Sequence, residues 1–126
     1  MSEQGQLILV ADDDEDILAL VSLRLRRLGY RVVQATDGEE ALAQVAQERP
    51  ALVILDLMMP RVDGYEVMRR LRAAPETVSL PVILLSARAR SADAAAGLDA
   101  GADAYLSKPF RAEELAAAIR GLLGQG

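Results

Sequence analysis

Short apolar runs alternate along the chain with longer segments in which apolar residues recur every three or four positions. The first run, Leu7 to Ala11, is continuous and aliphatic, which is typical of a strand covered on both faces of a sheet. Four similar runs follow it: Tyr30 to Ala35, Leu52 to Leu55, Pro81 to Leu85 and Ala104 to Ser107. This alternation predicts βα units arranged around a parallel sheet.

The first two helical segments have recognisable ends. The first is predicted to stop at Gly29, a residue suited to a left-handed cap. The second starts at a capping box made of Asp37 and Glu40 and ends before Pro50. Their apolar faces are predicted to be Ile17, Leu20, Val21, Leu25 and Leu28 in the first, and Ala41, Leu42, Val45 and Ala46 in the second.

Three further helical segments follow the later strands. Residues 91–100 are rich in alanine and carry one large apolar residue, Leu98, so this helix is expected to be poorly anchored and the most mobile. The helix before it spans about Tyr65 to Ala73, with Val67, Met68 and Leu71 pointing inward. The final helix is marked by Leu115, Ala118, Ile119, Leu122 and Leu123.

Length and pattern together predict the fold. The 126 residues suffice for one domain, residues 1–126, and 52% of them are hydrophobic, enough for a real core. Right-handed crossovers between five βα units give an α/β, doubly wound, three-layer sandwich of the flavodoxin-like type. Its parallel five-stranded sheet is predicted to have the order 2-1-3-4-5.

Composition excludes several classes of function. The chain has no cysteine, which excludes disulfides and Cys-based zinc or iron–sulfur sites, and no histidine, so a bound metal should be a hard, oxygen-preferring ion. A net charge of −5 argues against direct nucleic-acid binding. Neither a membrane span nor a signal peptide is visible, so a cytoplasmic location is expected.

Polar residues follow the ends of four strands, and these ends meet at one edge of a parallel sheet. Asp12 and Asp13 follow the first strand, Asp56 the third, Ser86 the fourth and Lys108 the fifth. Two unit charges about 4 Å apart at an effective dielectric near 20 repel by roughly 4 kcal/mol, so clustered carboxylates require a cation. Oxygen ligands with room for water favour Mg²⁺, with Mn²⁺ as a substitute.

The remaining features of this edge indicate a phosphoryl ligand. Lys108 is the only lysine among 14 basic residues, which indicates a need for a compact ammonium at this position. A divalent ion beside a carboxylate and a lysine suits a bridging phosphoryl group. The alternating Asp12, Asp14 and Asp16 do not form an EF-hand loop, because Ile17 occupies the position that requires glycine.

Four motifs in order, ILVADD, VILDLMMPRVDGYEV, PVILLSA and GADAYLSKPF, resemble the receiver domains of two-component response regulators over essentially the whole chain. The resemblance implies that Asp56 accepts a phosphoryl group and ligates Mg²⁺ together with Asp13 and the backbone carbonyl of Met58, while Asp12 assists through water. It further implies phosphoryl contacts from Lys108 and Ser86, a switch formed by Ser86 and Tyr105, and a cis bond before Pro109.

The resemblance also implies partners. The phosphoryl donor would be a sensor histidine kinase or a histidine phosphotransfer protein, and the chain would catalyse only its own phosphorylation and slow autodephosphorylation. A downstream effector would bind the face made of residues 91–100, 104–107 and 115–123. Ala104 and Ala118 replace charged residues that many relatives use to dimerise, so a monomer or weak dimer is expected.

Other interpretations remain at this stage. A pseudo-receiver would keep the fold as a constitutive interaction module. A phosphatase of the haloacid dehalogenase type would need a second aspartate where Met58 stands, and a flavodoxin-like electron carrier would need a phosphate loop where the chain is acidic. Structural roles are expected for Asp14, Glu15 and Asp16 at a helix start, and for Asp63 and Gly64 as turn and cap residues; Tyr105 could be a strand aromatic. The sequence leaves open whether the chain is a stand-alone receiver or part of a longer regulator or hybrid kinase.

Overall fold

The computed structural model describes residues 5–57, 59–86, 101–108 and 110–124 of the chain. The five strands are β1 (Leu7–Ala11), β2 (Arg31–Ala35), β3 (Leu52–Asp56), β4 (Val82–Ser86) and β5 (Ala104–Ser107). The helices in the described part are α1 (Glu15–Arg27), α2 (Gly38–Glu48), α3 (Gly64–Ala73) and α5 (Ala112–Leu123). The helix predicted at residues 91–100 lies outside the described residues. No helix within the described ranges has the length and apolar character needed to cross a membrane.

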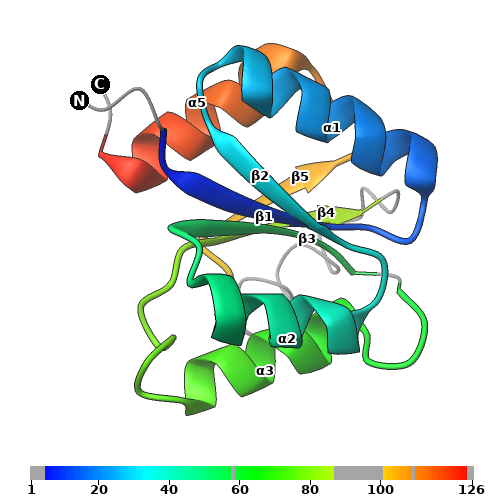
Figure 1. Cartoon of the computed structure of the whole chain (residues 1–126), viewed down its shortest axis with the longest axis vertical. Coiled ribbons are helices and arrows are strands. Elements are labelled where there is room, and N and C mark those ends of the chain that lie inside the picture. Colours follow the sequence, from blue (N-terminus) through cyan, green and yellow to red (C-terminus); the bar gives the residue numbers. More distant parts are fainter. Residues whose placement is uncertain (1–4, 58, 87–100, 109, 125–126) are drawn as a thin grey trace.

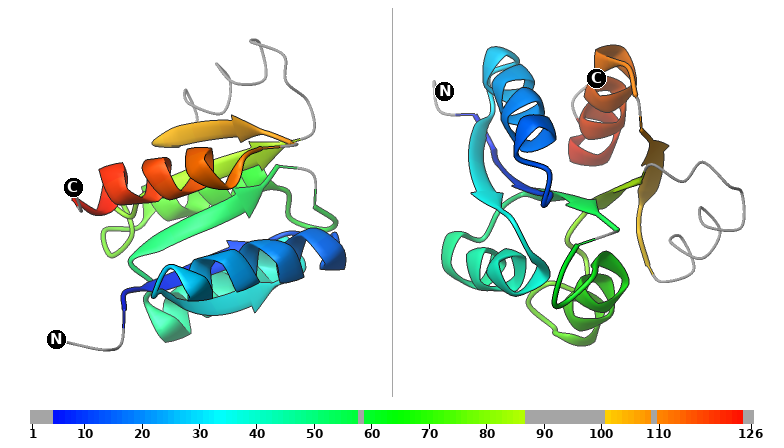
Figure 2. Two further views of the ribbon diagram at one scale, coloured as in Figure 1. Left: turned by 90° about the horizontal axis from the view of Figure 1, so that it is seen from above. Right: turned by 90° about the vertical axis from the view of Figure 1, so that its right-hand side faces the viewer.

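All five strands pair in parallel, in the order β2-β1-β3-β4-β5, as the sequence predicts. Helices α1 and α5 cover one face of the sheet, and α2 and α3 cover the other (Figures 1 and 2). The doubly wound α/β fold is therefore confirmed. This topology places β1 and β3 side by side at the centre, where residues that are distant in sequence become neighbours.

The sheet is buried on both faces, which explains the continuous apolar runs. Ile8 packs into the cluster beneath α1 and α5, whereas Leu9 packs into the cluster beneath α2 and α3. All five residues of β3 are buried, from Leu52 to Asp56. Successive side chains of a strand point to opposite faces, so each central strand supplies both layers of the core.

Aspartate residues cap three of the helices. Asp14 accepts hydrogen bonds from the amides of Asp16 and Ile17, Asp37 accepts one from Glu40, and Asp63 accepts one from Glu66. The Glu40 carboxylate in turn accepts from the amide of Thr36, one residue before the cap, so only the Asp37 half of the predicted capping box is confirmed. An anionic cap satisfies unpaired amides and favours the positive end of the helix dipole. The predicted structural roles of Asp14 and Asp63 are thereby confirmed.

The buried face of α1 differs from the prediction. Leu20 and Leu28 are 48% and 50% exposed, whereas the inward residues are Leu18, Val21, Ser22 and Leu25. Leucines lie all around this helix, so spacing alone did not fix which of them face the sheet. Ala46 of α2 is likewise exposed, contrary to the prediction. In α3, the predicted inward residues Val67, Met68 and Leu71 are all buried.

Close packing at the start of α2 leads to the first prediction. A Cβ built on Gly38 would lie 1.8 Å from the carbonyl oxygen of Val62, whereas a Cβ on Gly121 of α5 would meet nothing within 4 Å. Gly38→Ala should therefore lower the free energy of unfolding by about 2 kcal/mol. The matched change Gly121→Ala should raise it by about 0.5–1 kcal/mol, because alanine is the better helix former. Urea unfolding measures both, and equal effects would contradict the packing described.

Tyr30 gives a prediction for alkaline pH. Burial raises the pKa of its phenol above the usual value, and the positive charge of Arg120 offsets part of the rise. Because the pKa is higher in the folded state than in the unfolded state, the contribution of Tyr30 to stability is complete below about pH 10. This contribution is lost as the pH rises through the folded-state pKa. Tyr30→Phe should therefore make stability fall less steeply above about pH 10 in urea unfolding at a series of pH values. An unchanged slope would count against this role.

Candidate functional site

The carboxyl ends of β1 and β3 bring two aspartates together. Ala11 pairs with Leu55 in the parallel ladder, so the next residues, Asp12 just after β1 and Asp56 at the end of β3, lie side by side. Asp13 joins them, and carboxylate oxygens from the three residues all lie within 4.8 Å of one another. Asp12 is fully buried and Asp56 is 3% exposed, whereas Asp13 is exposed. The predicted convergence of these side chains is confirmed.

Lys108 approaches this cluster from the end of β5. Its Nζ lies 2.8 Å from Oδ2 of Asp12 and 3.5 Å from Oδ1 of Asp56. The lysine side chain is 13% exposed, so its ammonium interacts with the carboxylates in a medium that screens charge poorly. One cation therefore pairs with both buried aspartates.

A local turn fixes the orientation of Asp12. Its Oδ1 accepts a hydrogen bond of 2.9 Å from the amide of Asp14, while its Oδ2 accepts the bond from Lys108. This hydrogen bond from the Asp14 amide is not among the contacts predicted from the sequence. It could have been predicted from the sequence, because an aspartate at the start of a turn often accepts a hydrogen bond from the amide two residues later.

The charge balance of the cluster suits a divalent cation. Among the described residues, three carboxylates face one ammonium, which leaves an excess of two negative charges. The donors are hard oxygens, and the exposed Asp13 lies on the solvent side, where metal-bound water could be accommodated. These donors fit Mg²⁺ or Mn²⁺ and offer no soft ligand for zinc or copper.

The segment after Asp56 turns back onto the end of its own strand. The amide of Gly64 donates a hydrogen bond of 3.0 Å to the carbonyl of Leu57. A Cβ on Gly64 would lie 2.7 Å from the carbonyl oxygen of Asp56, so only glycine allows α3 to begin this close to the strand. The start of α3 thus supports the backbone that carries Asp56.

The remaining predicted site residues are described only in part. Ser86 is the last residue of β4 and pairs with Ser107 of β5, which places it at the same sheet edge, but its side chain lies outside the described residues. Tyr105 is half-buried and packs against the core cluster beneath α2 and α3. Met58 and Pro109 also fall outside the described residues.

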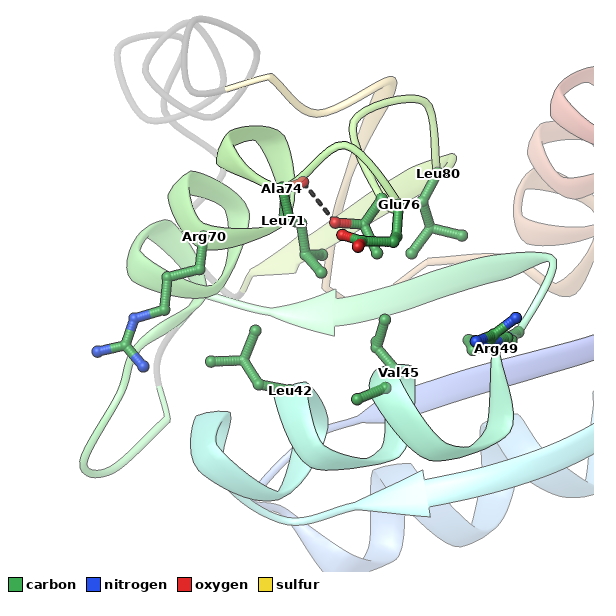
Figure 3. Close-up of a pocket in the computed structure, with 11 residues that line it drawn as sticks. Leu42, Val45, Arg49, Arg70, Leu71, Ala74, Glu76 and Leu80 are labelled. Carbon is green, nitrogen blue, oxygen red and sulfur yellow. Dashed lines mark hydrogen bonds between the residues drawn. The ribbon is translucent and has the colours of Figure 1, made fainter.

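A pocket of about 500 Å³ lies between α2 and α3, apart from the acidic cluster. Figure 3 shows Leu42 and Val45 of α2 facing Leu71 of α3 across it, with Arg49 and Arg70 at its margins. The loops that line it precede β3 and β4, so it lies at the opposite edge of the sheet from Asp56. Its lining is mainly apolar, and it contains none of the predicted site residues.

Comparison with known proteins identifies the family. Residues 8–120 match the family described as "Response regulator receiver domain". The chain belongs to this family. A receiver domain is a regulatory domain of a two-component system, and the phosphatase, electron-carrier and pseudo-receiver alternatives are not favoured.

Curated relatives extend the comparison. The receiver domain is 47% identical over 116 residues to the DNA-binding dual master transcriptional regulator RpaA of Synechocystis, covering 92% of this chain and 48% of RpaA. It is 50% identical over 116 residues to the response regulator MprA of Mycobacterium leprae, covering 92% of this chain and 50% of MprA. The chain thus spans about half the length of these relatives.

Solved structures resemble the receiver domain closely. A protein from Chloroflexus aurantiacus described as a response regulator superposes with a TM-score of 0.92 at 38% identity, covering 95% of this chain and 98% of that one. The receiver domain of a sensor histidine kinase from Pseudomonas aeruginosa gives 0.89 at 34% identity, with coverage of 95% and 98%. That structure has a magnesium ion coordinated in its active-site cleft.

Repulsion within the cluster predicts the effect of removing one charge. Asp13→Asn should raise the free energy of unfolding in the presence of a chelator, because it removes one of three carboxylates that repel one another. The gain should be only about 1 kcal/mol, because Asp13 is the exposed member and water screens its charge best. Asp16→Asn, in the first turn of α1 and outside the cluster, is the matched control. It should lower stability slightly through the helix dipole. Equal destabilisation by both changes, measured by urea unfolding, would contradict the repulsion.

Proposed function

We propose that the chain is a phosphoryl-accepting switch in which Asp56 takes a phosphoryl group from a partner phosphohistidine. The contact of Lys108 with both Asp12 and Asp56 carries this proposal. The ammonium lies 3.5 Å from a carboxylate oxygen of Asp56, close enough to neutralise oxygens of a phosphoryl group attached there. The partner would be a sensor histidine kinase or a histidine phosphotransfer protein, since this chain contains no histidine.

The carboxylates of Asp12, Asp13 and Asp56, together with the backbone carbonyl of Met58, are proposed to hold Mg²⁺ or Mn²⁺. Asp12 is proposed to act through water, because its two carboxylate oxygens already accept from Asp14 and Lys108. When bound, the ion supplies positive charge that offsets the negative charge of the phosphoryl oxygens.

The transfer requires no proton from the acceptor. A carboxylate oxygen of Asp56 attacks phosphorus, the new O–P bond forms as the N–P bond of the donor breaks, and the donor histidine leaves with the electron pair. Lys108 moves its ammonium from the two carboxylates toward the phosphoryl oxygens, and Ser86 donates its hydroxyl to another of them. Slow hydrolysis of the acyl phosphate would reset the switch.

The signal is proposed to reach the surface through β5. A phosphoryl group adds about −1.5 to −2 charges and three acceptor oxygens, which alter the partners of Lys108. Recruitment of Ser86 would leave space for Tyr105 to turn inward, changing the face made of residues 91–100, β5 and α5, where an effector binds. The cis bond before Pro109, the cytoplasmic location and the monomeric or weakly dimeric state stay predictions.

The phosphoacceptor can be tested with a small phosphodonor. With Mg²⁺ and acetyl phosphate, the wild-type chain should gain the mass of one phosphoryl group, and Asp56→Asn should gain none. Asp63→Asn is the matched control, because Asp63 ends the loop that follows Asp56 and asparagine also caps a helix, so this variant should be labelled normally.

Alternative outcomes separate the competing functions. Labelling of Asp56→Asn at the wild-type rate would contradict the assignment of the phosphoacceptor. Turnover of a small phosphomonoester would instead support a phosphatase. A wild-type chain that is never labelled but still binds its partners would support a constitutive interaction module.

A further inference from the structure

The loop that follows Asp56 is attached to the first turn of α2. Arg61 Nη1 lies 3.3 Å from Oδ2 of Asp37 and 3.8 Å from Oε1 of Glu39. The next residue, Val62, places its carbonyl against Gly38, where any Cβ would collide with it. Two consecutive loop residues therefore dock on the start of α2, although that helix belongs to a different βα unit.

Arg61 adopts an unfavourable backbone conformation. Its φ is +66°, and Arg49 is the other non-glycine residue with positive φ within the described ranges. Arg49 is the C-cap of α2, where left-handed residues are common, whereas Arg61 lies within a loop. A left-handed residue with a side chain is strained, and such strain persists where surrounding contacts hold the backbone in place.

The ion pair supplies such a contact. The two carboxylate oxygens of Asp37 have different partners. Oδ1 accepts a hydrogen bond from the amide of Glu40 and so caps α2, and Oδ2 accepts one from the guanidinium of Arg61. The Asp37 side chain is 16% exposed and that of Arg61 is 67% exposed, so this pair is screened less than one between two fully exposed side chains but more than a buried one.

We propose that Arg61 is a positioning residue for phosphoryl transfer, holding residues 59–63 of the loop after Asp56 against α2 so that the site around Asp56 is pre-formed. This inference rests on the proposed function. The loop follows Asp56, the last residue of β3, and its two ends are joined where the Gly64 amide donates to the Leu57 carbonyl. Arg61 attaches the part of the loop between these ends to α2. Removal of a group that hydrogen-bonds directly to a metal ligand commonly weakens metal binding by about tenfold to a hundredfold, and Arg61, which acts through the loop backbone, should have a smaller effect.

The test compares Mg²⁺ affinity with stability. Arg61→Gly relieves the backbone strain, so the unfolding temperature should be unchanged or higher. The same change removes the ion pair, so Mg²⁺ binding should weaken by about fivefold to tenfold. Arg49→Gly relieves strain at the far end of α2 and should leave Mg²⁺ affinity unchanged. Calorimetric titration with MgCl₂, thermal unfolding and the initial rate of labelling by acetyl phosphate provide the readouts.

A double-mutant cycle isolates the ion pair. Asp37→Asn keeps the cap acceptor and loses the charge, so it should weaken Mg²⁺ binding as Arg61→Ala does, and the double variant should show no further loss. Arg61→Lys should restore part of the affinity. Wild-type Mg²⁺ affinity in both Arg61→Gly and Arg61→Ala would overturn the inference. A wild-type chain that binds no Mg²⁺ and accepts no phosphoryl group would instead contradict the proposed function on which the inference rests.

Discussion

Three carboxylates that repel one another are held at one edge of the sheet, and Lys108 is the cation that reaches two of them. The hydrophobic core enforces this arrangement, because β1 from Ile8 onward and all of β3 are buried and cannot separate without exposing apolar surface. The cluster therefore keeps an excess of negative charge in a medium that screens it poorly. A site in this state favours a ligand that brings positive charge.

The segments that carry the cluster are held by backbone contacts at Asp12 and Asp56, whereas the loop after Asp56 contains a strained residue, Arg61. Asp12 is fixed by the ladder before it and by the Asp14 amide after it. The backbone of Asp56 is supported by Gly64, which lets α3 begin against the end of β3. The loop between Asp56 and Gly64, by contrast, is attached to α2 by the ion pair of Arg61, whose side chain is largely exposed.

Much of the fold could be predicted because each element has a strong local cause. The apolar runs of β1 and β3, the caps at Asp37 and Asp63 and the inward face of α3 follow from period and side-chain chemistry. The buried face of α1 could not, because leucines surround that helix and only contact with the sheet selects among them. The convergence of Asp12, Asp13 and Asp56 was predictable because parallel strands end at a common edge.

The sequence alone determined which residues could carry the chemistry: oxygen donors and one lysine after successive strands, without cysteine or histidine, as reflected in its motifs. The tertiary structure decided how those residues share charge, with Lys108 bonded to Asp12 and near Asp56, and with Asp14 turning Asp12 toward it. It also decided that Arg61 meets Asp37. Local patterns fix the identity and spacing of side chains along a chain, but contacts between residues 24 or 96 positions apart depend on how the packed core orients the strands and loops.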